Sequence, residues 1–162
     1  MINKTDHIRR YTCADMNITQ VIRKSLSDNF ERIPYTNEGG YIATDIGEKE
    51  DDEHLLIMVS GFLDGAGIMM QEVTVVYFDT IERANRFRRS EEGRIFGDRF
   101  SDGKDCFDYT TFAGNPALPN LIATILRNHF NIKDNSYLIA HTYCNVDYFR
   151  KDTEKKSSIQ QN

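Results

Sequence analysis

Apolar residues recur near the start of the chain at the spacing of an amphipathic helix. Steps of close to three and four residues place one apolar stripe along it, made of Ile18, Val21, Ile22, Leu26 and Phe30. Asp15 and Asn17 are both residue types that cap helices, and Pro34 follows the stripe. The pattern therefore predicts a helix from about residue 15 or 17 to about residue 30.

Three shorter segments then predict strands. Residues 41–46 suit a short strand, and residues 54–62 are almost continuously apolar, as in a strand that lies in the middle of its sheet. Residues 72–78 alternate in the manner of a further strand. Asp64-Gly65-Ala66-Gly67 is typical of a hairpin turn, so we expect the second and third strands to pair antiparallel.

The second half of the chain repeats this mixture of helix and hairpin. A helix begins after Asp79 or Thr80 and continues to about residue 90, with Ile81, Ala84 and Phe87 on one side. Two strands, at about 94–100 and 106–112, are joined by a turn at Asp102-Gly103. A third helix opens at Asn115-Pro116, with Asn as cap and Pro in the first turn, and a last strand is expected at 136–143.

The predicted order is α-β-β-β-α-β-β-α with a possible C-terminal strand. Hairpins dominate and helices are few, which favours an α+β fold with an antiparallel sheet of about five strands and three helices. We expect one domain over residues 15–150, a loose segment over residues 1–14 and a disordered polar tail over residues 151–162.

Charge is distributed unevenly along the 162 residues, whose net charge is −5. The stretch 45–53 holds six acids and one lysine, and is interpreted as a solvated loop. The stretch 81–100 holds six arginines and four acids, which is typical of a salt-bridged helix face. Because the chain as a whole is acidic, we expect no nucleic-acid partner.

Localisation follows from what the sequence lacks. No apolar run approaches the roughly 20 residues of a membrane helix, so no membrane partner is expected. The first residues have no apolar stretch typical of a signal peptide, and the three cysteines are an odd number. These features predict a cytoplasmic protein with reduced thiols.

No motif predicts a cofactor, a metal or a catalytic site. The glycines of 61–67 lead into a strand and lack the Lys-Ser/Thr of a phosphate-binding loop, and the cysteines lack zinc spacing. One alternative remains, a small enzyme or ligand-binding protein. Its pocket would use the residues Asp105, Cys106, His129 and His141. Carboxylates are the residue type that acid–base catalysis or Mg²⁺ binding needs, and four of them lie near the second hairpin. They are Asp98, Asp102, Asp105 and Asp108.

Aromatic residues gather in the second half of the chain. They include Tyr77, Phe78, Phe87, Phe96, Phe100, Phe107, Tyr109 and Phe112. Three helices cannot cover both faces of such a sheet, so we expect some of these rings to lie on an exposed face. Exposed aromatic surfaces are usually interfaces with partners.

The segment around the second helix and hairpin carries a family resemblance. Ala84-Asn85-Arg86-Phe87-Arg88-Arg89, followed by residues 93–109 with the Asp102-Gly103 turn, resembles the helix–hairpin segment of YbjN-like proteins. That family has a fold similar to the type III secretion chaperones, and the element order agrees with it over about residues 15–131. Two features depart from the family pattern: Arg86 replaces an aromatic residue, and the strand at 136–143 is additional.

The resemblance implies a non-enzymatic, protein-binding module, a chaperone-like protein or a YbjN-like regulator, that forms a homodimer. We expect it to bind a protein partner through its sheet face and aromatic patch. Pairing through the second helix and the strand after it would place at the interface the residues Asn85, Arg86, Arg88, Arg89, Phe96 and Phe100. A further alternative is a phage or plasmid antagonist, or an immunity protein, whose acidic run 45–53 blocks a basic cleft.

Overall fold

The computed structural model describes residues 7–14, 16–36, 39–49, 54–75, 78–101, 104–133 and 137–144. Within these ranges the strands are β1 (His7–Thr12), β2 (Ile42–Gly47), β3 (Leu55–Leu63), β4 (Met69–Val75), β5 (Gly97–Ser101), β6 (Lys104–Phe112) and β7 (Ile139–Cys144). The helices are α1 (Ile18–Arg32), α2 (Ile81–Arg89) and α3 (Leu118–His129), with short 3-10 helices η1 (Ile33–Tyr35) and η3 (Glu92–Ile95).

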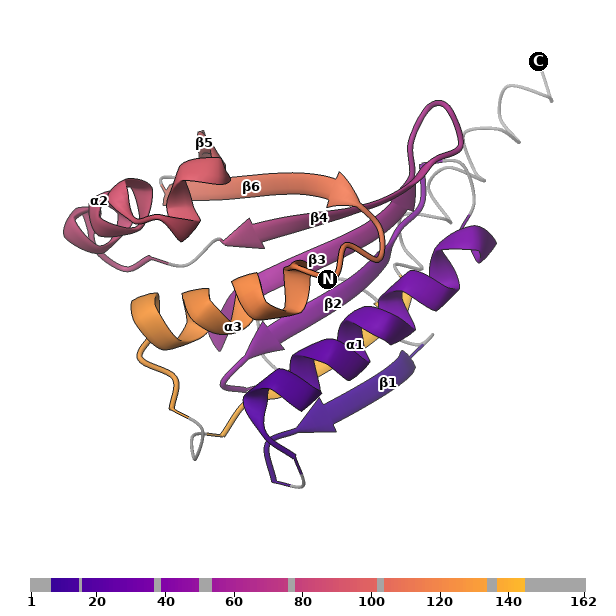
Figure 1. The fold of residues 1–162 in the computed structure, drawn as a ribbon, viewed down its shortest axis with the longest axis horizontal. Helices are drawn as coiled ribbons and strands as arrows, with labels where there is room; N and C mark the ends of the chain where they lie inside the picture. Colours follow the sequence, from indigo (N-terminus) through magenta and orange to yellow (C-terminus); the bar gives the residue numbers. More distant parts are fainter. Residues whose placement is uncertain are drawn as a thin grey trace, which may run out of the picture.

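All the strands belong to one antiparallel sheet with the order β1-β7-β2-β3-β4-β6-β5 (Figure 1). The α+β class and the antiparallel sheet are confirmed, but the sheet of the described residues has seven strands and not five. The C-terminal strand is present as β7, and it pairs with β2 in the sheet interior.

The N-terminal strand β1 corrects the expectation of a loose segment over residues 1–14 for residues 7–12 only, because residues 1–6 lie outside the described part of the chain. It pairs with β7, with Tyr11 opposite Ala140, and the Tyr11 hydroxyl donates to Asp28 of α1 at 2.7 Å. The sequence of β1 has too few apolar residues to predict a strand. The segment is extended because it pairs with β7, which lies about 130 residues away in the sequence. Residues 151–162 lie outside the described part of the chain.

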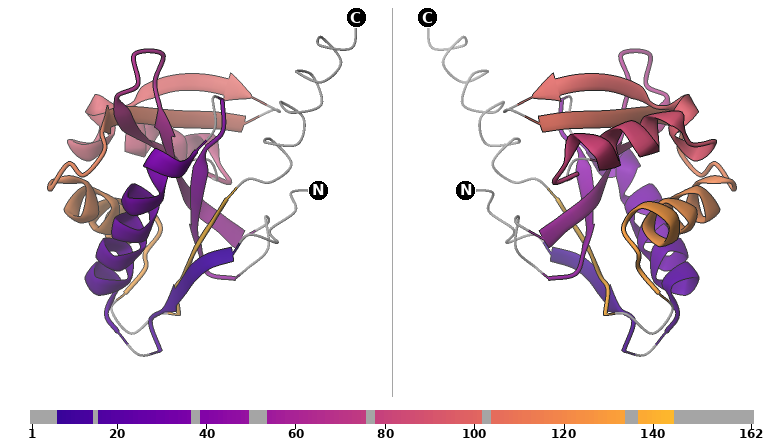
Figure 2. Two further views of the ribbon diagram at one scale, coloured as in Figure 1. Left: turned by 90° about the vertical axis from the view of Figure 1, so that its right-hand side faces the viewer. Right: turned by 90° about the vertical axis from the view of Figure 1, so that its left-hand side faces the viewer.

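The three α-helices of the described residues lie on one face of the sheet (Figure 2). Helix α1 begins at the Asn17 cap, where Asn17 and Gln20 form a reciprocal capping box. Its predicted apolar stripe faces the sheet, where Ile18, Val21 and Ile22 are fully buried. The other face of the sheet is called the open face below, and it carries Phe112 with 67% of its surface exposed.

Helix α3 starts later than predicted. Asn115 accepts the backbone N–H of Ala117 through its side chain at 3.0 Å, so it caps a turn that precedes the helix. Ala117 is the helix cap itself and makes no side-chain hydrogen bond, and Pro119 lies in the first helical turn. The predicted pair Asn115-Pro116 therefore marks the loop between β6 and α3.

The strand predicted at 94–100 is also shorter than expected. Glu92–Ile95 form η3, and β5 begins only at Gly97. Gly93 is packed so closely under the end of α2 that a Cβ would overlap the backbone of Phe87, and its N–H donates to the Ser90 hydroxyl at 3.0 Å. This close approach turns the chain back, and extended structure can begin only after it.

No helix within the described residues is long and apolar enough to cross a membrane.

Candidate protein-binding surface

Helix α2 is held in place by a cluster of aromatic rings. The helix begins at Thr80, whose hydroxyl accepts the N–H of Arg83 at 3.2 Å. Its buried residue Phe87 lies at the centre of the cluster, with ring centroids 4.8 Å from Phe107 and 5.3 Å from Phe78. These edge-on and tilted contacts are favourable arrangements for aromatic pairs, so α2 is firmly placed over β6.

Arg83 closes the aromatic cluster at the side next to α3. The Phe78 and Phe130 rings are stacked with centroids 5.1 Å apart, and the Arg83 guanidinium lies 5.8 Å and 5.6 Å from the two centroids. Arg83 also donates to the backbone oxygen of His129 at 2.6 Å and forms an ion pair with Asp79 at 2.8 Å. This arginine is a structural link between α2 and the end of α3.

Arg88 links α2 to the second hairpin. Its guanidinium lies 2.5 Å from the Asp98 carboxylate, 3.7 Å from the Asp105 carboxylate and 5.3 Å from the centroid of Phe107. The hydrogen bond with Asp98 raises the pKa of Arg88 above its ordinary value. Arg88 also donates to the Asn85 side chain. Two of the predicted interface residues, Arg88 and Asn85, therefore bind one another and are partly buried in the single chain.

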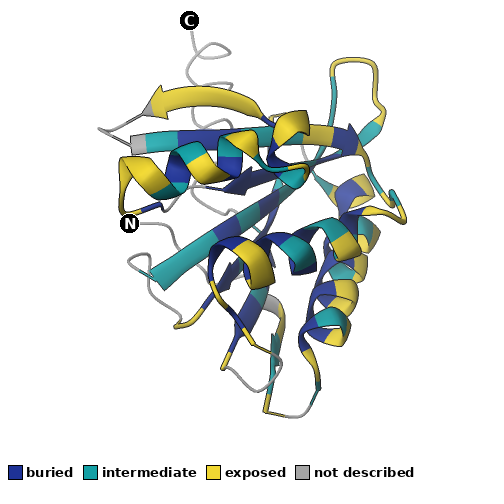
Figure 3. Cartoon of the chain, turned by 60° about the vertical axis from the view of Figure 1, so that its left-hand side comes forward, coloured by how far each residue is buried: buried dark blue, intermediate teal, exposed yellow. Residues whose placement is uncertain are grey.

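Around this anchored helix, large apolar side chains remain exposed. Ile81 is 75% exposed, Ile95 is 50% exposed and Phe100 of β5 is 72% exposed. Arg86 and Arg89 of α2 are exposed as well, and exposed segments of α2 and β5 lie at the same end of the molecule (Figure 3). We call this region the α2–β5 surface. It consists of Ile81, Asn85, Arg86, Arg89, Ile95 and Phe100.

The strand β5 contributes an edge to this surface. It is last in the strand order and pairs only with β6 among the described strands. Alternate residues of an edge strand direct their N–H and C=O groups away from the sheet, where they can pair with an added strand.

Phe96 does not belong to this surface, which corrects the predicted interface. It is only 9% exposed and packs edge-on against Phe87 with centroids 5.2 Å apart. Ile81, in contrast, was expected on the buried side of α2 with Ala84 and Phe87, and it is exposed. Ile81 occupies the first position of α2, at the end of the helix, whereas Ala84 and Phe87 lie in its later turns and are buried.

The residues of the alternative catalytic pocket are not brought together. Asp105 and Cys106 are consecutive in β6 and point to opposite faces of the sheet. His141 lies in β7, and three strands, β4, β3 and β2, separate β7 from β6. His129 lies on the helix-covered face at the end of α3. The structure thus gives no common pocket to these four residues.

His129 forms a buried pair with Glu92 of η3. The distance from His129 Nε2 to Glu92 Oε1 is 2.6 Å, and the His129 side chain is only 5% exposed. Burial acts to raise the pKa of Glu92, but hydrogen bonds from its backbone, His129 and Asn128 outweigh burial and hold that pKa below its usual value. Phe87 packs edge-on against the histidine ring at 5.1 Å. The pair fixes η3 against α3, as expected of a satisfied core histidine.

The carboxylates of the second hairpin are divided between the two faces of the sheet. Asp98 and Asp105 bracket Arg88, whereas Asp108 binds Arg99 at 2.5 Å and accepts the Thr74 hydroxyl at 2.8 Å. Asp102 lies outside the described residues. Within the described residues no group of three or more His, Cys, Asp or Glu side chains is placed to hold a metal ion.

The acidic run 45–53 is described only in part. Asp45 lies in β2, where its carboxylate accepts the Tyr143 hydroxyl at 3.0 Å, and Glu48 and Lys49 are exposed. Residues 50–53 lie outside the described residues, so the expected acidic partner-binding loop stays a prediction.

Comparison with known proteins adds no family. No protein-family model, curated protein or solved structure matches this chain.

Proposed function

We propose that this protein is a non-enzymatic protein-binding module that forms a homodimer through the α2–β5 surface and binds a protein partner. The observation that carries the proposal is the exposure of Phe100 on the edge strand β5, together with the exposure of Ile81 on α2 and of Ile95 on η3, which packs against α2. Large apolar side chains gathered on one surface are typical of sites that a partner covers.

The edge strand supplies the directional part of the interaction. A second chain can extend the sheet by pairing along β5, and main-chain hydrogen bonds then provide affinity while side chains provide specificity. In a two-fold arrangement centred on Phe100, the two Phe100 rings face each other and each Arg99 lies opposite the partner's Ser101. Because Arg99 already binds Asp108, this register brings no unpaired charge to the centre.

The exposed arginines supply the charged margin of the interface. Arg86 and Arg89 are exposed on α2, whereas Arg88 is held by Asp98. Arginine is enriched in protein interfaces, and its planar guanidinium group can form two hydrogen bonds with one carboxylate. A protein partner with acidic residues beside an apolar segment fits this combination.

The resemblance to YbjN-like proteins and type III secretion chaperones supports the same assignment. That resemblance implies pairing through the second helix and the strand that follows it, which are α2 and β5 here. The succession of α1, three strands, α2, two strands and α3 agrees with the plan of those proteins, with β1 and β7 as additions.

The proposal is tested by measuring the mass of the protein in solution. We expect a dimer by native mass spectrometry and sedimentation equilibrium, and a monomer for Phe100→Asp. The matched control is Phe112→Asp, which changes a similarly exposed ring on the open face and should leave the dimer intact. A monomeric wild type would contradict the dimer, and a dimer that survives Phe100→Asp would contradict pairing through the α2–β5 surface.

Partner binding is tested separately with arginine variants. The protein is purified gently from its own host, together with a variant in which Arg86 and Arg89 are replaced by Glu. We expect a stoichiometric protein partner with the wild type and its loss from the variant. A partner that the variant retains would place the binding site elsewhere on the molecule.

A further inference from the structure

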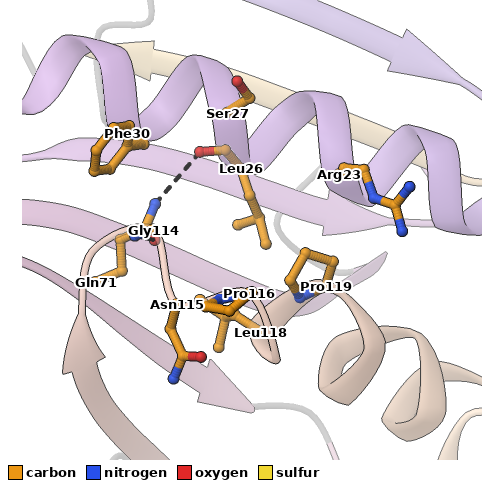
Figure 4. A pocket seen from close by; sticks show the side chains of 10 residues that line it. All are labelled: Arg23, Leu26, Ser27, Phe30, Gln71, Gly114, Asn115, Pro116, Leu118 and Pro119. Atoms are coloured by element: carbon orange, nitrogen blue, oxygen red, sulfur yellow. Dashed lines mark hydrogen bonds between the residues drawn. The ribbon is translucent and has the colours of Figure 1, made fainter.

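A cleft of about 410 Å³ lies between α1 and the loop that joins β6 to α3, away from the α2–β5 surface (Figure 4). Its volume falls in the range of small-molecule sites. Its walls are mostly apolar, and its lining includes Arg23, Leu26, Phe30, Gln71, Gly114 and Leu118. None of these residues was singled out by the sequence for binding.

The rim of the cleft is built in a fixed conformation. Gly114 has φ +79°, a conformation that side chains disfavour, and a Cβ there would lie 3.2 Å from the Phe30 ring. The Gly114 N–H donates to Gln71 at 3.2 Å, and the Asn115 amide donates to the Thr111 hydroxyl at 2.9 Å. The loop is therefore tied to the sheet, and the cleft exists before any ligand arrives.

Gln71 lines the cleft, but its polar groups are already used within the protein. Gln71 is 1% exposed, and its amide nitrogen donates to the Asn29 side chain at 3.0 Å and to the Leu26 backbone oxygen at 3.4 Å. Its amide oxygen accepts the Gly114 N–H. Because the Gln71 side chain is engaged on both ends, the interior favours an apolar group from the ligand.

Arg23 supplies the charge at the mouth. It projects from α1 toward the first turn of α3 (Figure 4), it is exposed, and it forms no ion pair with the described residues. A single guanidinium beside an apolar cavity matches a ligand with one anionic group and an apolar body.

We propose that this cleft binds a small amphipathic carboxylic acid. Its apolar body lies against Leu26, Phe30 and Leu118, and its carboxylate pairs with Arg23. The assignment is independent of the protein-binding function, because the cleft and the α2–β5 surface share no residue.

Phenylbutyrate is the probe, and phenylbutanol is its matched neutral analogue. Titration of each into the full-length protein, followed by amide chemical shifts, reports both the affinity and the place of binding. We expect phenylbutyrate to shift the amides of Leu26, Phe30 and Leu118, and phenylbutanol to bind about fivefold more weakly, which corresponds to one partly exposed ion pair.

Two exposed arginines of the same helix separate the charge effect from a general one. Arg23→Gln should weaken phenylbutyrate about fivefold and leave phenylbutanol unchanged, whereas Arg32→Gln should alter neither. No saturable binding, shifts confined to another region, or equal affinity for Arg23→Gln and wild type would each overturn the proposal. If the cleft binds a short peptide that ends in Phe but does not bind phenylbutyrate, its ligand is a protein chain, and the proposal of a small carboxylic acid is overturned as well.

Discussion

The two ends of the helix-covered face are packed by opposite chemistry. Under α2 the contacts are ring on ring, with Phe87 touching Phe78, Phe96 and Phe107. Under α1 the apolar stripe is interrupted by a buried polar seam that consists of Ser25, Asn29, Thr44, Gln71 and Thr142. Aromatic packing tolerates small rearrangements, but a buried hydrogen-bond network needs every partner in place. The α1 end is therefore the more exactly specified of the two.

Asn29 is the centre of the polar seam. Its amide nitrogen donates to the Ile42 oxygen and the Thr44 hydroxyl, both at 3.1 Å, and its amide oxygen accepts from Gln71 at 3.0 Å. Gly61 lies directly below, where a Cβ would overlap the Asn29 oxygen. The glycine in β3 thus makes room for the asparagine of α1.

Replacing Asn29 by leucine gives the largest expected effect. Asn29→Leu keeps nearly the same volume but removes the buried hydrogen bonds that Asn29 makes with Gln71, Thr44 and the Ile42 oxygen, so unfolding should become easier by about 3 kcal/mol. Urea denaturation measures this loss. Asn120→Leu, on the exposed side of α3, is the control and should stay within about 0.5 kcal/mol of wild type.

A leucine replacement at the aromatic end allows a direct comparison with Asn29→Leu. Phe87→Leu removes ring contacts but leaves no polar group unpaired, and neighbouring rings can move into part of the space. We expect a loss of about 1.5 kcal/mol in the same urea experiment. A larger loss for Phe87→Leu than for Asn29→Leu would show that the polar seam is not the more demanding end.

Arg88 gives a smaller effect that depends on salt. Arg88→Gln breaks the ion pairs with Asp98 and Asp105, but these groups are about a third exposed, so the expected loss is about 0.5 kcal/mol at low salt. The loss should shrink as salt is raised, because exposed charges are screened. Arg86→Gln is the control, and a salt-independent loss for Arg88→Gln would instead indicate a packing role over Phe107.

Sequence patterns predicted the elements that are determined by residues close together in the sequence. The stripe of α1, the hairpins and the cap at Thr80 all follow from neighbouring residues, and each is present. Features that depend on distant partners were missed. The strand β1 is ordered by β7, and Phe96 is buried because Gly93 folds η3 back under α2.

The candidate sites, like the elements of the fold, include one feature that the sequence predicted and one that depends on distant residues. The expectation that three helices leave some aromatic rings on an exposed face is confirmed by Phe112 on the open face. Phe100 is exposed for another reason, because it lies on the edge strand β5 on the side of the sheet that carries Asp105 and the helices. The cleft, however, depends on Gln71, whose partners Leu26 and Asn29 lie more than 40 residues away in the sequence. Nothing in the local pattern of β4 distinguishes Gln71 from an ordinary polar position of a strand.

The smallest effect is a pH dependence at the aromatic end, where Glu92 is the buried acid. The pKa of Glu92 is lower in the folded protein than its usual value of 4.5, so its contribution to stability is complete above that value. The contribution is lost as pH falls through the lowered folded pKa. Glu92→Gln should therefore be less stable than wild type near neutral pH, by under about 1 kcal/mol, and should approach wild-type stability as pH falls through the lowered folded pKa and Glu92 becomes protonated. Urea denaturation over this range measures the difference, and Glu91→Gln removes the same charge from an exposed neighbour as a control. A difference that stays constant with pH would mean that Glu92 acts through its shape alone and that its contact with His129 of α3 does not depend on the charge of Glu92.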